Sequence, residues 1–209
     1  LGDVYKRQLS WSSYLEPLVN PDAWRDPSTH TSSTLAHELA VTFRSQLTLD
    51  NTRVIPQANA TLGGLYSVRG YPQSVAVGDD LYIGTVEYRF HVPRVLPVRR
   101  KPLTVPLIGD FRASPQQVYG RPDWDLVLRA FVDAGYTERH GADPSRGEQN
   151  QTLFSAGVGA ELLILSNIRA RLDYAVALDD ESGPRTATPG RNLVDRGDSE
   201  IHVLFSIVY

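Results

Sequence analysis

The chain has 209 residues, a formal net charge of −3, 41% hydrophobic residues, and neither Cys nor Met. Such a balanced charge argues against a nucleic-acid-binding protein, which would carry a basic face. The lack of Cys excludes disulfides, thiolate metal sites and cysteine nucleophiles. No apolar run reaches the roughly 18 residues that a membrane-spanning helix needs. The mean hydropathy of −0.27 is typical of soluble chains, but also of membrane β-barrels, whose strands alternate apolar and polar residues.

The N-terminal segment begins with LGDVYKRQ, which resembles read-through of sequencing adapters. We expect residues 1–8 to be a non-native leader without structural weight, and residues 9–209 to belong to one domain. Because Met is absent, we expect the chain to be an excerpt of a longer protein. A strand is expected near Leu9–Leu15, and another over Leu35–Leu49. On the latter, one face carries His37, Leu39, Val41, Phe43 and Ser45.

Four later segments alternate apolar and polar residues with a period of two, which predicts strands with one apolar face. They are Tyr82–Phe90, Leu126–Tyr136, Phe154–Ile164 and Ile168–Leu178. The face opposite the apolar one carries Glu87, Arg89, Arg129, Asp133, Glu161, Arg169, Arg171 and Asp173. Alternation alone leaves a soluble antiparallel sheet open. These runs exceed the roughly 5–6 residues of globular strands and match the roughly 9–11 of tilted membrane strands, which favours a membrane barrel.

The connections between these segments differ in length. Ser166 and Asn167 predict a tight turn, whereas Thr137–Thr152 and Asp179–Ser199 predict long polar loops. Outer-membrane barrels have short periplasmic turns and long outer loops. The Pro-rich and basic stretch 93–122 falls where a short turn is expected, and we interpret it as an insertion. Trp124 and Tyr136 share one apolar face and are expected in the two aromatic girdles.

Two motifs add information about function. The last residues, 200–209, read EIHVLFSIVY, and Phe205, Ile207 and the terminal Tyr209 lie on the apolar face. A final strand that ends on an aromatic residue is similar to the signal that the barrel-assembly machinery recognises. Residues 62–71 read LGGLYSVRGY, within a connection over residues 57–80. We call this connection the VRGY loop; its motif consists of Val68, Arg69, Gly70 and Tyr71.

Together with FVDAG at residues 131–135, these motifs resemble the superfamily of outer-membrane polypeptide transporters. That superfamily includes the two-partner secretion transporters of the haemolysin-activator type and the barrel-assembly proteins. The resemblance covers roughly residues 57–209. LGGLYSVRGY and EYRFHVP are slightly closer to the secretion transporters, whereas FVDAG and RLDYA are shared with the assembly branch.

The resemblance implies a fold, a site and partners. The fold is all-β: six to eight antiparallel strands forming the C-terminal part of a sixteen-strand transmembrane barrel in the bacterial outer membrane. The VRGY loop would enter the lumen, where Arg69 would meet Asp133 and Glu87 on the inner wall. The small residues Ser155, Gly157 and Gly159 would leave room for the loop. The partners would be outer-membrane lipid, an unfolded secreted client polypeptide, and the barrel-assembly machinery during biogenesis.

Enzymatic functions find little support in the sequence. His37-Glu38 lacks the second His of a metalloprotease helix, and neither a GxSxG elbow nor a phosphate loop occurs. We therefore expect no catalytic residues, no metal and no cofactor. The expected function is export of a partner polypeptide; the alternatives are a barrel-assembly factor, a passive porin and a soluble binding barrel.

Overall fold

The computed structural model describes residues 4–29, 31–32, 35–49, 52–106, 109–146, 148–165, 167–181 and 193–208. Seven long strands form one antiparallel sheet in which each strand pairs with its neighbours in chain order. These strands are β1 (Val4–Tyr14), β2 (His37–Thr48), β5 (Asp80–His91), β8 (Trp124–Glu138), β9 (Gln151–Ile164), β10 (Ile168–Ala177) and β11 (Ser199–Ile207). The prediction of an all-β chain built on a large antiparallel sheet is confirmed.

The remaining elements are short and lie in the connections. Two small hairpins pair β3 (Ala60–Leu62) with β4 (Ala76–Gly78), and β6 (Leu103–Val105) with β7 (Gly109–Phe111). The helices are α1 (Glu16–Val19) and α2 (Pro21–Arg25), with 3-10 turns at Pro27–Thr29, Pro56–Ala58, Val92–Val95 and Pro144–Arg146. Over the described ranges, no helix has the length and apolar character needed to cross a membrane.

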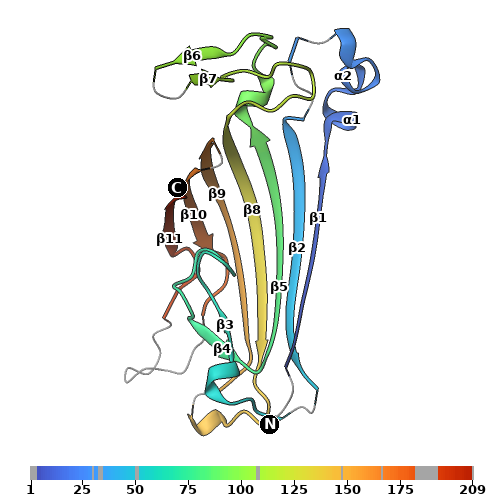
Figure 1. Ribbon diagram of the computed structural model, residues 1–209. Helices are drawn as coiled ribbons and strands as arrows, with labels where there is room; N and C mark the ends of the chain where they lie inside the picture. The colour runs from blue at the N-terminus through green and yellow to red at the C-terminus, as the bar shows by residue number, and fades with distance from the viewer. Residues whose placement is uncertain are drawn as a thin grey trace.

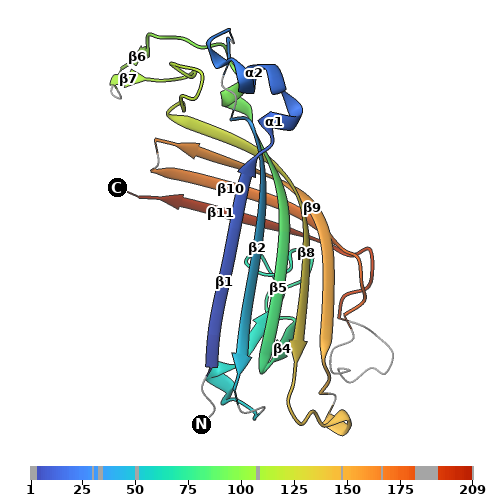
Figure 2. The ribbon, with the colours of Figure 1, turned by 90° about the vertical axis from the view of Figure 1, so that its right-hand side faces the viewer.

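The large sheet is curved, and β3 and β4 lie on its concave side (Figures 1 and 2). We call the side that carries β3 and β4 the inner face, and the opposite side the outer face. β3 and β4 lie toward one end of the long strands. The segment with β6 and β7 lies at the opposite end, as do α1 and α2 (Figure 1). The two ends of the sheet therefore carry different structures.

Alternation along each strand separates two chemically different faces, as the sequence predicted. The outer face exposes large apolar side chains from every long strand: Leu9, Trp11, Phe43, Val86, Leu128, Val132, Phe154, Val158, Leu172, Tyr174, Ile201, Val203 and Phe205. The inner face buries charged side chains: Glu87, Arg129, Asp133 and Asp173 are at most 5% exposed. This distribution is the reverse of that in a soluble protein, where charged residues are rarely fully buried.

The first strand begins earlier than the sequence suggested. β1 pairs with β2 over its whole length, from Val4 opposite Thr48 to Tyr14 opposite Glu38. The expectation that residues 1–8 carry no structure is therefore wrong for residues 4–8. Tyr5 and Leu9 lie on the outer face with Trp11, because the alternation of β1 already starts within the opening residues.

The sequence analysis predicted short turns at one end of the strands and long loops at the other. The prediction of short turns is wrong for two of the three connections at that end. The turn between β9 and β10 is short, with the N–H of Asn167 donating to the carbonyl of Ile164; Ser166 lies outside the described residues. The other two connections at this end, over residues 15–36 and 92–123, are long. Buried Glu16 accepts hydrogen bonds from the N–H groups of Ala36 and His37 at 2.5 and 2.9 Å, which fastens the first of them to β2.

Candidate functional site

The VRGY loop belongs to the connection between the end of β2 and the start of β5. It folds back from there and packs on the inner face of the sheet. Its apolar side chains join residues of the strands and of the connection after β10 in one buried cluster. The cluster consists of Leu62, Val68, Tyr71, Ala76, Ile83, Leu153, Ala177 and Val194. A Cβ on Gly135 would collide with Leu62 and Val68, at 2.5 and 2.7 Å, so the loop sits directly on the β8 backbone. Burial of this apolar area holds the loop in place.

Arg69 makes a forked contact with Asp133, as the resemblance implied. Its Nε and one terminal nitrogen lie 2.7 and 2.9 Å from the two carboxylate oxygens, and its backbone N–H donates to Asp133 at 3.1 Å. Asp133 is fully buried and also accepts a 2.9 Å hydrogen bond from the Thr85 hydroxyl. Such bidentate charge-assisted pairs are stronger and more directional than a single contact. Arg69 thereby fixes the loop to β8.

Further groups surround the same guanidinium. The second terminal nitrogen lies 3.0 Å from Glu87 on β5 and 3.5 Å from Asp173 on β10. The guanidinium carbon stands 3.3 Å from the centre of the Phe131 ring, a cation–π geometry. Burial disfavours the charge on Arg69, but the hydrogen bonds and attraction of Asp133 and Glu87 outweigh it and raise its pKa. Arg69 therefore stays charged, and it ties the loop to three strands at once.

These contacts belong to a larger ion-pair network on the inner face. Within it, Arg129 lies 2.7 Å from Asp173, and Arg89 lies 2.7 Å from Glu87. The network joins five arginines to five carboxylates: Arg69, Arg89, Arg129, Arg169 and Arg171 with Glu38, Glu87, Asp133, Glu161 and Asp173. Its charges balance, as buried ions require. Removal of one member leaves its partners uncompensated, which typically costs about 3–5 kcal/mol.

Gly70 and Tyr71 place the loop against β9 and β10. Gly70 has a φ of +98°, and a Cβ there would lie 3.0 Å from the Val176 backbone and 3.1 Å from Ser155. Glycine avoids both the strain and the clash. The Tyr71 hydroxyl lies 2.7 and 3.1 Å from the carbonyl oxygens of Asp179 and Phe154. Burial raises the pKa of Tyr71 against the opposing effect of these hydrogen bonds, so it remains a neutral donor.

The three small residues of β9 have different neighbours from those expected. Ser155 contacts the VRGY loop at Gly70, as predicted. The expectation that Gly157 and Gly159 leave room for the loop is wrong: a side chain on Gly157 would strike the Phe131 ring, and one on Gly159 would strike Asp173. Because these glycines have no side chains, they leave space for Phe131 and Asp173, which both contact Arg69. They therefore affect the loop indirectly, by the placement of these two residues.

The C-terminal residues of the predicted signal do not join this site. Phe205 and Ile207 are exposed on the outer face of β11, at 64% and 55%. β11 pairs only with β10 among the described strands, and Tyr209 lies outside the described residues. Their role as a recognition signal stays a prediction.

Asp173, Arg129 and Phe131 were not predicted as members of the Arg69 site, although the alternation places Arg129 and Asp173 on the inner face. The strand register explains their proximity, because Gly159 lies opposite Arg129 on one side and Asp173 on the other. The tight turn between β9 and β10 gives the signal for the Asp173 pairing, because the register starts with Ile168 opposite Ile164 and therefore brings Asp173 opposite Gly159.

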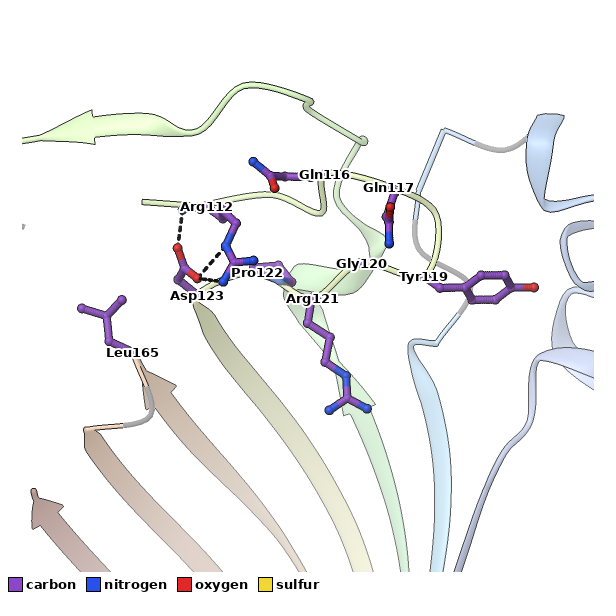
Figure 3. Close-up of a pocket in the computed structure, with 9 residues that line it drawn as sticks. All are labelled: Arg112, Gln116, Gln117, Tyr119, Gly120, Arg121, Pro122, Asp123 and Leu165. Atoms are coloured by element: carbon purple, nitrogen blue, oxygen red, sulfur yellow. Dashed lines mark hydrogen bonds and ion pairs between the residues drawn. The ribbon is translucent and has the colours of Figure 1, made fainter. Parts of the chain in front are cut away.

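The Pro-rich stretch expected as an insertion is fastened to the strands at the opposite end. Arg112 forks onto Asp123 through two nitrogens at 2.8 and 2.5 Å, and the backbone N–H of Arg112 donates to the same carboxylate at 2.7 Å (Figure 3). Buried Arg94 donates to Asp125 at 2.8 Å, to the Tyr14 hydroxyl at 3.1 Å and to the Leu35 carbonyl at 2.9 Å. This connection therefore links β1, β8 and the segment that leads into β2.

An ion pair between two connections at the VRGY-loop end predicts a pH response. Glu148 pairs with Arg53 and accepts the N–H of Asp143, and the hydrogen bond from Arg53 is the main cause that lowers the pKa of Glu148 to about 2. The contribution of this pair to stability is therefore present above the unfolded pKa of about 4.3 and lost as the pH falls toward 2. The pKa of Glu148 can be measured by carbon-13 NMR titration, with its signal assigned by the loss of that signal in Glu148→Gln. Arg53→Gln should return the pKa of Glu148 toward about 4.3. An unchanged pKa would contradict the pairing.

No family model matches the chain, and a comparison with curated proteins finds no match either.

Proposed function

We propose that the chain forms the C-terminal part of an outer-membrane β-barrel that exports a partner polypeptide, in the manner of two-partner secretion transporters. The observation that carries the proposal is the Arg69 fork on Asp133. It places a loop, folded back from one end of the sheet, against the charged inner face of membrane-length strands. Neither a porin nor a soluble sheet explains why a buried arginine should tie such a loop to three strands.

The outer face supports a lipid environment. It exposes apolar side chains on all seven long strands, far beyond the patches that soluble monomers tolerate. β8 has 15 residues; at about 3.3 Å each and a tilt of about 45°, it spans about 35 Å, which exceeds the apolar band of about 25 Å. Aromatic groups gather at both ends: Tyr82 faces Tyr136 at 6.3 Å, and His37 faces Phe90 at 5.0 Å.

The inner face supports a conformational role for the loop. The polar inner wall suits a water-filled passage, and the VRGY loop occupies part of its space. A client polypeptide would need that space, so the loop has to move or to guide the chain past it. The forked pair then sets the resting position of the loop. The proposal requires further strands of the whole protein to close the barrel, because a membrane-spanning sheet cannot leave its edges unpaired.

The experiment is to delete the complete gene in its host and to follow two readouts. Export predicts that one secreted partner disappears from the medium and accumulates or is degraded in the periplasm, while the other outer-membrane proteins keep their levels. Re-expression of the gene should restore secretion. Loss of many outer-membrane barrels would instead indicate the assembly function. Recovery of the full-length protein in the soluble fraction without detergent would overturn the membrane proposal altogether.

A further inference from the structure

We propose that a basic cavity on the inner face, at the end opposite the VRGY loop, binds acidic side chains of the exported polypeptide. The inference rests on the proposed function and names a recognition site for its client. The cavity has a volume of about 340 Å³ and lies where the 92–123 connection meets the strands. Five arginines line it, Arg89, Arg94, Arg121, Arg129 and Arg169, together with the four carboxylates Glu38, Asp123, Asp125 and Glu161, which leaves one arginine in excess.

Four of these arginines already have carboxylate partners. Arg94 lies 2.8 Å from Asp125, and Arg169 lies 2.7 Å from Glu161. Arg89 and Arg129 pair at 2.7 Å with Glu87 and Asp173, respectively, within the inner-face network. Glu38, the remaining carboxylate of this part of the lining, lies 3.6 Å from Arg89 and 3.1 Å from His91, so these contacts hold the walls of the cavity in place.

Arg121 differs from the other four. Among the described residues it has no ion pair, and its one hydrogen bond is a 3.4 Å contact with the Tyr14 hydroxyl. The adjacent carboxylate, Asp123, is taken by the fork of Arg112. The Arg121 side chain is exposed and points from the connection toward the strands (Figure 3). The cavity lining thus presents one guanidinium without a counter-ion.

The geometry favours a carboxylate ligand on a polypeptide. A free guanidinium offers a planar fork that matches a carboxylate. Arg89 and Arg169, with side chains 38% and 46% exposed, extend the positive surface beside it. The cavity opens on the inner face, away from the outer face that would contact lipid phosphates. A segment of the client polypeptide that passes along the inner face would meet Arg121 at the edge of the cavity.

The test is peptide binding to the purified full-length protein in a neutral detergent, followed by fluorescence anisotropy. The probes are a labelled peptide with four Asp residues and a matched peptide with Asn at the same positions. Arg121→Gln should weaken binding of the Asp peptide about twofold to fivefold, the size of one exposed ion pair, and salt should weaken it further. Arg99→Gln is the matched control, since Arg99 is exposed on the same connection but does not line the cavity.

Equal binding of the two peptides, or an equal effect of Arg99→Gln and Arg121→Gln, would overturn the inference. The binding assay does not depend on secretion, so the two proposals can fail separately. A protein that exports its partner but does not distinguish the peptides loses only the acidic-recognition site. A protein that distinguishes the peptides but exports nothing loses the proposed function.

Discussion

Replacing Arg69 with Ala is expected to lower secretion of the partner polypeptide by at least about tenfold. The change removes the fork on Asp133, the ion pair of this buried carboxylate, and takes away one of the arginines around Glu87, which keeps Arg89 at 2.7 Å. Breaking a buried pair in this way typically costs about 3–5 kcal/mol, enough to release the VRGY loop from its position. Partner protein in the medium should be quantified by immunoblotting, normalised to the amount of folded transporter measured by heat-dependent gel migration.

A double-mutant cycle tests whether the contact itself matters. Asp133→Ala should impair secretion about as much as Arg69→Ala, and the double variant should add little, because both changes remove the same interaction. Arg69→Lys should restore secretion only in part, since an ammonium cannot form the fork. Arg146→Ala is the matched control: this arginine is 74% exposed, and among the described residues its one ion pair is with Asp143 in its own connection. Fully additive defects would count against a direct contact.

The strands and their two faces could be predicted from the sequence because alternation is a local property. On β8 and β10 every second residue is apolar, a period of two that a helix does not have. In β1 the expected strand began at Leu9 and left out Tyr5, because the opening residues were judged by their resemblance to an adapter sequence and not by their periodicity.

The Arg69–Asp133 contact was predictable from two motifs, whereas the rest of the site depends on register. Asp173 reaches Arg69 from a strand 104 positions further along the chain. Which inward residue of β10 stands beside Arg129 depends on the turn after β9 and on the side-chain space at Gly159. Periodicity predicts the face of the sheet on which a residue lies, but not the register of its strand with the neighbouring strands. The contacts of Asp173 were therefore not predicted.

The connections were the least predictable part. Pro17, Pro21 and Pro27 each begin a helical turn or lie in its first positions, which makes residues 16–29 a series of helical turns. The buried contacts of Glu16 and Arg94 that anchor these segments are long-range, and no local pattern announces them.

Asp173 should contribute more to stability than any other single carboxylate of the network. It is fully buried and lies 2.7 Å from Arg129, 2.6 Å from Arg171 and 3.5 Å from Arg69. Asp173→Ala leaves three guanidinium groups crowded together without this counter-ion. We expect the free energy of unfolding to fall by about 3–5 kcal/mol, measured by urea unfolding of the full-length protein in lipid vesicles.

Two further variants separate the charge from general damage. Asp110→Ala removes an exposed aspartate of β7 and should change the free energy of unfolding by less than about 0.5 kcal/mol. Adding Arg171→Gln to Asp173→Ala should recover part of the loss, because among the described residues Arg171 forms its ion pair with Asp173 alone, so its removal leaves no other carboxylate uncompensated. If the double variant is less stable than Asp173→Ala alone, Asp173 acts by packing and not as the shared counter-ion. In that case the packing of Phe131 and Asp173 against Gly157 and Gly159 would stabilise the inner face more than its balanced charges do.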